Sequence, residues 1–371
     1  MEIQKKRDSN LELLRIVAMF FIIAHHYVVN SGLMDPGGPM YGDLLSPRAL
    51  FLLSLAGIGK SAMNIYVLIT GYFMCVSNII AKKYFKLLFE WMFYRLLIGS
   101  IFWLTGREPF TFLNFINVII PIRQVAYNFT ECYLLFYLFI PFLNRFIRGL
   151  NEKQYLYLIG LCLLTYVFFG TLHDISFNYI SWFFILYLIA AYIRLFPKPI
   201  TQNSSFCGKI LTFSLILSWL SMFLCAILTV NNILWTPFYF VQDANSLLPL
   251  VNGLSAFLYF KNKNIPYNRT LNRFAASSFG VLLIHANSKI MHKWLWVDSF
   301  KVYDAYNSSF VYLHAVGSIL LVFILCALID MLRIQYIEKP FFALWDAKWA
   351  MFRKKYDKAE EKLLSRFIMP Q

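Results

Sequence analysis

The stretch RIVAMFFIIAHH, residues 15 to 26, has an arginine at one end of an otherwise apolar run and two histidines at the other. Burying ionisable side chains in an apolar helix costs free energy, so such residues are usually kept for a function. In an α-helix, Arg15 and His26 are about three turns, or roughly 16 Å, apart along nearly the same stripe. We therefore expect one helix face to carry both, with His25 directed about 80° to 100° away from it.

The whole chain has the composition of a membrane protein. Its 371 residues are 59% hydrophobic and 14% charged, whereas soluble domains are about 45–50% apolar. Apolar runs of about 17–25 residues, the length that crosses the hydrocarbon of a bilayer, recur along the chain. Because these runs are continuously apolar rather than alternating, they favour helices over a β-barrel. The sequence predicts an all-α, polytopic integral membrane protein.

We expect about ten transmembrane helices in one domain, residues 1–338. Their approximate spans are 11–30, 55–76, 84–104, 129–147, 155–171, 179–196, 209–229, 244–261, 273–293 and 310–332. In residues 339–371, aromatic residues are mixed with many lysines and arginines. This composition is typical of an interfacial amphipathic helix, although a basic cytoplasmic tail that only helps to fix topology would look the same.

Lysine and arginine gather in alternate loops of this arrangement. A net charge of +15 would suggest nucleic acid as the partner of a soluble protein, but here the positive-inside rule explains it. One side of the membrane receives the basic groups within 5–7, 82–86, 145–153, 194–198, 261–269 and 333–366. The exceptions on the other side are Arg48, Arg107, Arg123, Lys293 and Lys301. We therefore expect both termini in the cytoplasm, the chain in the cell membrane, and no nucleic-acid partner.

The cysteines do not indicate a metal site. Six are scattered along the chain, and no CxxC pair or Cys/His cluster has the spacing of metal ligands. We expect neither a zinc site nor a disulfide framework. The sequence also contains no Ser/His/Asp signature, P-loop or G-x-G-x-x-G fingerprint.

A second segment, GKSAMNIYVLITGYF at residues 59 to 73, interrupts an apolar run with Lys60, Asn64 and Thr70. Gly59 and its neighbour Gly57 allow another backbone or a ligand to approach closely. The segment is therefore a candidate wall of a site. Helix packing through small residues is the commoner use of such glycines in membranes.

A third segment, SSFGVLLIHANSKIMH at residues 277 to 292, carries His285, Asn287 and His292 near its expected outer end. A single histidine in such a position is more often a hydrogen-bonded interfacial residue than a catalyst. We assign His173 and His314 to that ordinary role.

Together, the three segments resemble the integral membrane acyltransferase-3 family, which acylates surface polysaccharides and related glycans. The family carries an arginine, ten residues and a histidine on its first helix, matched here by Arg15 and His26. Its next helix has a pattern like G-x-G-V-D-x-F-F-V-I-S-G-Y/F-F. Here Asn64 stands at the acidic position and Thr70 at the serine.

Two later motifs carry the same resemblance. The family shows S-x-G-x-Y-L-I-H near its end, and in this chain Leu282 replaces the tyrosine of a motif that closes with His285. The sequence IEKPF, residues 337 to 341, is similar to the exit of the family's last helix.

The resemblance implies transfer of an acyl group, most often acetyl, from cytoplasmic acyl-CoA to a hydroxyl of a surface polysaccharide or other glycan. Acetyl-CoA would be the donor substrate, and no metal is implied. Arg15 with Lys82, Lys83 and Lys86 would bind the donor's phosphates at the inner mouth. His26 would be the general base, acting directly or through an acyl-histidine intermediate.

Other residues would contact the substrates or the oxyanion of the transition state. The candidates are Lys60, Asn64, Tyr72, Glu131, His285 and Asn287, with Tyr127 and Asn128 beside Glu131 at the expected outer entrance of the fourth helix. The sequence leaves open the acceptor glycan, the acyl chain, the oligomeric state and the role of His25.

A transporter or flippase of glycan or lipid-linked sugar is the alternative function. It would also need a polar path through ten helices. It would need no acyl donor, so its activity should survive loss of the His26 base.

Overall fold

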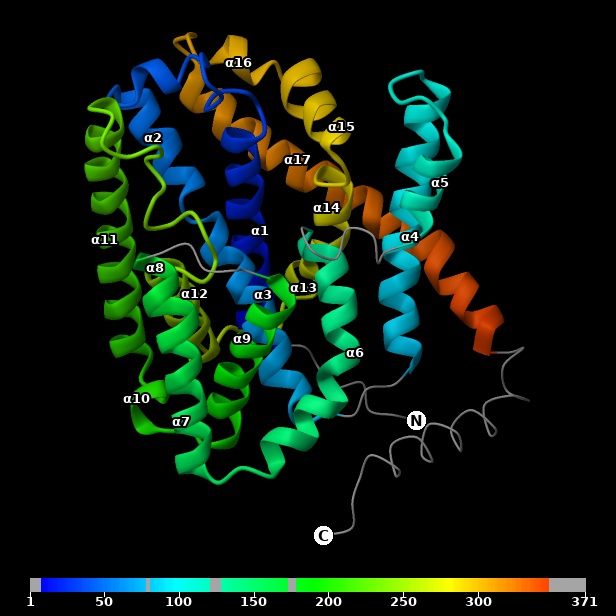
Figure 1. The fold of residues 1–371 in the computed structure, drawn as a ribbon. Helices are drawn as coiled ribbons and strands as arrows, with labels where there is room; N and C mark the ends of the chain where they lie inside the picture. Colours follow the sequence, from blue (N-terminus) through cyan, green and yellow to red (C-terminus); the bar gives the residue numbers. More distant parts are fainter. Residues whose placement is uncertain (1–7, 78–80, 121–127, 173–177, 347–371) are drawn as a thin grey trace.

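The computed structural model describes residues 8–77, 81–120, 128–172 and 178–346, and within these ranges the regular elements are all helices (Figure 1). Among the described residues, six helical stretches are long and apolar enough to cross a membrane. They are Ser9–Val29, Pro47–Met74, Ala81–Leu104, Glu152–Leu172, Ser204–Val230 and Val311–Asp346. The expected all-α, multi-pass membrane fold is confirmed, while the count of ten crossings and the cytoplasmic termini stay predictions.

The described residues contain the following α-helices, in chain order. They are α1 (Ser9–Val29), α2 (Pro47–Ala56), α3 (Gly59–Met74), α4 (Ala81–Leu104), α5 (Phe112–Ile119), α6 (Phe129–Arg148), α7 (Glu152–Leu163), α8 (Phe169–Leu172), α9 (Tyr179–Leu195), α10 (Pro199–Gln202), α11 (Ser204–Val230), α12 (Leu247–Lys261), α13 (Arg269–Ala276), α14 (Ser278–His285), α15 (Lys289–His292), α16 (Val302–Ala305) and α17 (Val311–Arg333). A 3₁₀ turn covers Tyr41–Asp43, and π-helical segments cover Leu164–Phe168, Lys293–Ser299 and Ile334–Glu338.

The helix expected at 55–76 corresponds to α3, and its start is set by a break between α2 and α3 at residues 57–58. The break occurs where two other helices come too close for side chains. A Cβ at Gly57 would overlap Met222 of α11, and a Cβ at Gly59 would overlap His25 of α1. Glycine is therefore required for this close approach, and α3 begins directly against His25.

The expected single helix at 273–293 is wrong. It is divided into α13, α14 and α15, with breaks at Ser277 and at residues 286–288. Polar groups satisfy the helix ends: the Asn268 side chain accepts from Leu271 N at the start of α13, and the Ser288 side chain accepts from Met291 N at the start of α15. Caps of this kind replace the hydrogen bonds that a helix end lacks.

Helix α1 lies in the middle of the bundle and packs against α2, α3, α12, α13, α14 and α17 (Figure 1). One side of it is apolar and buried, including Leu14, Ala18, Met19 and Ile23. Helix α3 in turn packs on α9 through Gly71, where a Cβ would lie 2.9 Å from the Cβ of Ala190. Small residues let these helices approach closely, as is usual in membranes.

The two ends of the bundle differ in charge. The end of α6, whose last turn carries Arg145 and Arg148, lies at the same end of the bundle as α10 and the start of α4 (Figure 1). The start of α2, the end of α11 and α16 lie at the opposite end. We call the first end the inner end, following the positive-inside rule. Helix α1 runs from the inner end outward, so Arg15 lies nearer that end than His26.

The last helix does not stop at the expected domain boundary. From α17 it continues through the π-helical segment Ile334–Glu338 to Asp346. Residues 347–371 lie outside the described part of the chain, so the interfacial tail stays a prediction.

Replacing Gly71 with alanine should destabilise the α3–α9 contact. The added Cβ forces a shift against Ala190, and overpacking of this kind costs about 1–3 kcal/mol. The matched control is Gly160→Ala in α7, where a Cβ would meet no other atom within 4 Å. Helix propensity alone should make this control neutral or more stable by up to about 1 kcal/mol. Thermal unfolding of the purified protein in detergent measures both, and an unchanged midpoint for Gly71→Ala would contradict the packing.

Candidate active site

His26 of α1 and His285 of α14 meet inside the bundle. Nδ1 of His26 lies 3.0 Å from Nε2 of His285, whose side chain is fully buried. Nδ1 of His285 lies 2.6 Å from the carbonyl oxygen of Val281, one turn earlier in α14. Each ring therefore has a hydrogen-bond partner that restricts its orientation.

These contacts assign the protons of both imidazoles. A carbonyl oxygen can only accept, so Nδ1 of His285 must carry the proton that is donated to Val281. The Nε2 of a neutral His285 then accepts, and Nδ1 of His26 must be the donor. The remaining nitrogen of a neutral His26, Nε2, carries a free lone pair. The pair holds His26 in the tautomer whose Nε2 can take up a proton.

His26 lines a cavity of about 200 Å³, which we call the His26 cavity. Its walls come from α1, α3, α4, α6, α9 and the region from α14 to α15. The lining residues are Ile22, His25, His26, Lys60, Met63, Trp91, Arg95, Asn128, Phe129, Thr130, Glu131, Tyr179, Leu282, Leu283, Ala286, Asn287 and His292. Of the candidates named from the sequence, Lys60, Glu131 and Asn287 thus lie around one cavity with His26, and their roles stay predictions. Tyr127 lies outside the described residues.

His25 also lines this cavity but has a separate partner. Its Nδ1 lies 3.0 Å from the carbonyl oxygen of Ala56, the last residue of α2. Nδ1 of His25 therefore donates to a carbonyl at the end of a helix, where the normal partner is missing. His292 is closer to the reactive pair, with its ring centroid 5.2 Å from that of His26.

Glu131, at the start of α6, is buried in the cavity wall. Its carboxylate accepts from Trp91 Nε1 at 3.3 Å and from Thr130 Oγ1 at 2.6 Å. Two donors therefore hold this carboxylate in a fixed position. The sequence analysis named Glu131 without these partners.

Arg95 is a site residue that the sequence analysis missed. It lies in the apolar helix α4, is 7% exposed, and donates from Nη1 to the carbonyl oxygen of Asn287 at 2.7 Å. Nη2 donates to Asn117 of α5 at 3.3 Å. Arg95 thus satisfies a carbonyl in the break between α14 and α15, which places His285 and His292 around His26. An arginine inside an apolar run, the signal that singled out Arg15, would have found it.

Arg15 lines a second cavity, of about 160 Å³, which we call the Arg15 cavity. Its lining residues are Arg15, Tyr66, Thr70, Leu87, Phe129, Tyr133, Ala275, Ala276, Ser278 and Phe279. Phe129 lines both cavities, so they adjoin at this side chain. Nη1 of Arg15 pairs with Oε1 of Glu12 at 2.7 Å, and Tyr66 donates to the Arg15 carbonyl at 2.9 Å.

Two candidates from the sequence analysis lie in helix contacts rather than in either cavity wall. Asn64 is 1% exposed, donates to the Ala244 carbonyl at 2.8 Å and accepts from Trp182 Nε1 at 2.9 Å. The Tyr72 hydroxyl accepts from Arg194 at 2.8 Å. Both residues hold α3 against its neighbours.

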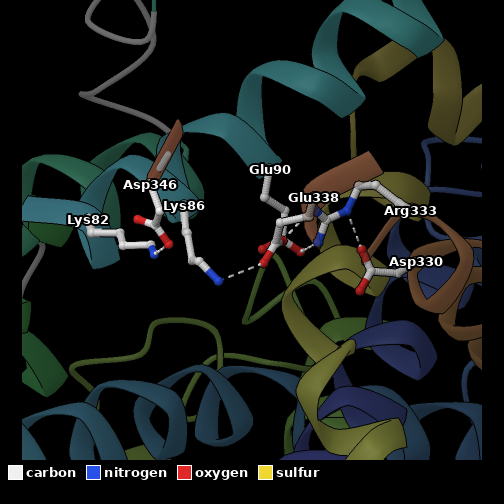
Figure 2. Close-up of polar contacts among 7 residues, drawn as sticks. All are labelled: Lys82, Lys86, Glu90, Asp330, Arg333, Glu338 and Asp346. Carbon is white, nitrogen blue, oxygen red and sulfur yellow. Dashed lines mark hydrogen bonds and ion pairs between the residues drawn. The ribbon is translucent and has the colours of Figure 1, made fainter. Parts of the chain in front are cut away.

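The three lysines at the start of α4 differ in their partners and exposure. Lys82 pairs with Asp346, and Lys86 pairs with Glu338 at 3.3 Å (Figure 2). Lys83 is exposed.

The two remaining histidines are His173 and His314. His314 hydrogen-bonds to Tyr27 and to the Phe300 carbonyl, as expected for a structural residue. His173 lies outside the described residues. Within the described part of the chain, no group of His, Cys, Asp or Glu side chains has the arrangement of a metal site.

The chain belongs to the acyltransferase-3 family, because its residues 8–331 match the family's acyltransferase domain. The resemblance drawn from the Arg15–His26 helix and the two later segments is confirmed. No curated protein and no solved structure matched the chain in the same comparisons. Together with the membrane-spanning helices, the family assignment makes this protein a multi-pass membrane acyltransferase.

Proposed function

We propose that this protein transfers an acyl group, most simply acetyl, from cytoplasmic acyl-CoA to a hydroxyl of a surface polysaccharide or other glycan at the cell membrane. His26 is the general base of this reaction. The observation that carries the proposal is the chain of hydrogen bonds from Val281 through His285 to His26, which leaves Nε2 of His26 free to accept a proton. A base oriented by a second group is a recurring arrangement for nucleophile activation.

The reaction needs only two substrates, the acyl-CoA donor and the sugar hydroxyl. Nε2 of His26 takes the hydroxyl proton as the sugar oxygen attacks the carbonyl carbon of the thioester. The tetrahedral intermediate then collapses, the carbon–sulfur bond breaks, and the ester remains on the glycan. The imidazolium returns its proton to the departing thiolate, so that free coenzyme A leaves as a thiol and His26 is neutral again.

The oxyanion of the tetrahedral intermediate requires a positive or hydrogen-bonding partner. We assign this role to Lys60, whose side chain lines the His26 cavity at the start of α3. An ammonium group in a water-poor cavity stabilises a developing negative charge more strongly than it would in water. The amide of Asn287 donates to the Leu283 carbonyl at 3.1 Å, so its main effect is to hold the α14–α15 break.

The two adjoining cavities provide a path for the two substrates. The donor enters from the inner end, where Arg15 lines the Arg15 cavity and Lys83 at the start of α4 is exposed, so that these two cations can meet its phosphates. Its acyl group extends past Phe129 to His26. The glycan hydroxyl enters the His26 cavity from the outer half, where Asn128 and Glu131 at the start of α6 form part of the wall.

Replacing His26 with alanine should remove acylation of the surface glycan. Mass spectrometry of glycans from cells that produce each variant at matched expression measures the acyl mass. His314→Gln is the matched control, because His314 is a hydrogen-bonded histidine outside both cavities. We expect no acyl mass with His26→Ala, as in a deletion strain, and a normal acyl mass with His314→Gln.

Two results would count against this function. Full acylation by His26→Ala would exclude His26 as the base. Loss of the entire glycan from the surface of the deletion strain, rather than loss of its acyl groups, would favour a transporter.

His285 should act by positioning His26, which a pair of substitutions can show. His285→Leu removes the acceptor for Nδ1 of His26, whereas the amide oxygen of His285→Gln can still accept. We expect the leucine variant to lose roughly a hundredfold or more in kcat, with little change in the KM for acetyl-CoA, and the glutamine variant to recover part of this loss. Release of the coenzyme A thiol measures both. Equal kcat values for the two variants would show that the hydrogen bond does not orient His26.

A further inference from the structure

Three lysines lie within five residues at the start of α4, but two of them are already neutralised. Lys82 pairs with Asp346, and Lys86 pairs with Glu338 (Figure 2). Both carboxylates belong to the α17 extension, residues 334–346. A phosphate that approached Lys82 or Lys86 would have to displace a carboxylate from each.

The α17 extension is fixed in this position by buried contacts. The guanidinium of Arg333 is 2% exposed and pairs with Glu90 of α4 at 3.1 Å, with Asp330 at 2.8 Å and with Glu338 at 2.8 Å (Figure 2). Breaking such a buried network costs free energy, because each partner would be left as an uncompensated charge.

Aromatic contacts hold the same two elements together. The rings of Phe89 and Phe341 stack with centroids 4.6 Å apart, and Phe85 contacts Trp345 at 5.7 Å. Aromatic pairs add about 0.5–1.5 kcal/mol to the area that they bury. The exposed Lys82–Asp346 pair would contribute little alone, but here it joins an interface that already exists.

The interface between α4 and the α17 extension has no excess of positive charge that could bind an anionic ligand. Three cations, Lys82, Lys86 and Arg333, face four carboxylates, those of Glu90, Asp330, Glu338 and Asp346. The cluster is acidic overall if all groups are ionised. It is therefore a poor binding site for the phosphates of coenzyme A.

Of the three lysines, Lys83 lies nearest to the cavity-lining side of α4. At about 100° a residue, Leu87 is one turn after Lys83 and about 40° around the helix from it. Lys86 and Lys82 lie about 100° and 140° around the helix from Leu87. Leu87 lines the Arg15 cavity, and Trp91 and Arg95 line the His26 cavity. Trp91 and Arg95 lie further around the helix from Lys83, by about 80° and 120°, and Arg95 is about 18 Å along it.

Lys83 also differs from its neighbours in charge balance. It is exposed near the inner end of α4, and among the described residues it has no carboxylate within ion-pair distance. A lysine is a compact point charge that binds phosphate well. Lys83 is thus the α4 lysine whose charge is available and which lies nearest to Leu87 in the wall of the Arg15 cavity.

We propose that the nucleotide end of the acyl-CoA donor binds at Lys83, one turn before Leu87 at the inner end of α4, and that Lys82 and Lys86 instead hold the α17 extension. This inference rests on the proposed function, since it takes acyl-CoA as the donor. It reduces the number of α4 lysines proposed to bind the donor's phosphates from three to one. The pantetheine arm then lies along Leu87 and Trp91, and the thioester reaches His26.

Binding of acetyl-CoA to the full-length protein in lipid nanodiscs, measured by calorimetry without an acceptor, tests the inference. The variants Lys82→Gln, Lys83→Gln and Lys86→Gln each remove one positive charge from the same helix, so they are controls for one another. We expect Lys83→Gln to weaken binding about tenfold, which corresponds to about 1.4 kcal/mol. The other two should stay within about twofold of the wild type, and Lys83→Arg, which keeps the charge, within about threefold.

The outcomes separate this inference from the proposed function. If the wild type binds acetyl-CoA and Lys83→Gln binds it equally well, or if all three glutamine variants lose the same affinity, the inference is wrong while the donor assignment stands. If the wild type does not bind acetyl-CoA at all, the proposed donor is wrong, and the inference fails with it. Because Lys83 is exposed, its substitution should leave the thermal unfolding midpoint unchanged, which the same samples can show.

Discussion

The hydrogen bond between His26 and His285 is the interaction on which the site depends. It joins α1, at the centre of the bundle, to a short helix near the other end of the chain. In a medium of low polarity, a hydrogen bond between neutral groups is strong, and an unmade one is costly. The Val281 carbonyl fixes the tautomer of His285, and His285 fixes that of His26. The Val281 carbonyl thus determines, through His285, that Nε2 of His26 is the nitrogen that can accept a proton.

Interrupted helices make this contact possible. His285 ends α14 and His292 ends α15, and the ring centroid of each lies 5.2 Å from that of His26. The break between these two helices is held by Arg95, which donates to the carbonyl of Asn287 there. A second break brings the first turn of α3, with Lys60, against His25. Irregular backbone at membrane depth is tolerated where it lines a cavity, as it does here.

The sequence was sufficient to predict the all-α membrane fold, because the length and continuity of apolar runs are local properties. It also predicted the Arg15–His26 stripe, since both residues belong to one helix. It did not predict the two breaks, because the glycines and polar residues that permit them also occur in continuous helices. The close approach of Met222 to Gly57 depends on α11, far along the chain.

Contacts between distant segments were equally inaccessible to sequence reasoning. His285 was a candidate, but its contact with His26 joins residues 259 positions apart. Neither the pairing of Lys82 with Asp346 nor the role of Arg95 in the α14–α15 break follows from local pattern. The three α4 lysines were therefore expected to act together, whereas the structure places two of them against the α17 extension.

Cryo-electron microscopy of the protein with a thioether analogue of acetyl-CoA, whose acyl group cannot be transferred, would show where the donor binds. We expect the acyl carbonyl in the His26 cavity, within reach of a hydroxyl activated by Nε2 of His26, and the nucleotide at the inner end beyond the Arg15 cavity. His26 and His285 should remain hydrogen-bonded. An acyl group bound away from His26, or a nucleotide on the Asn128 side of the cavity, would contradict this expectation.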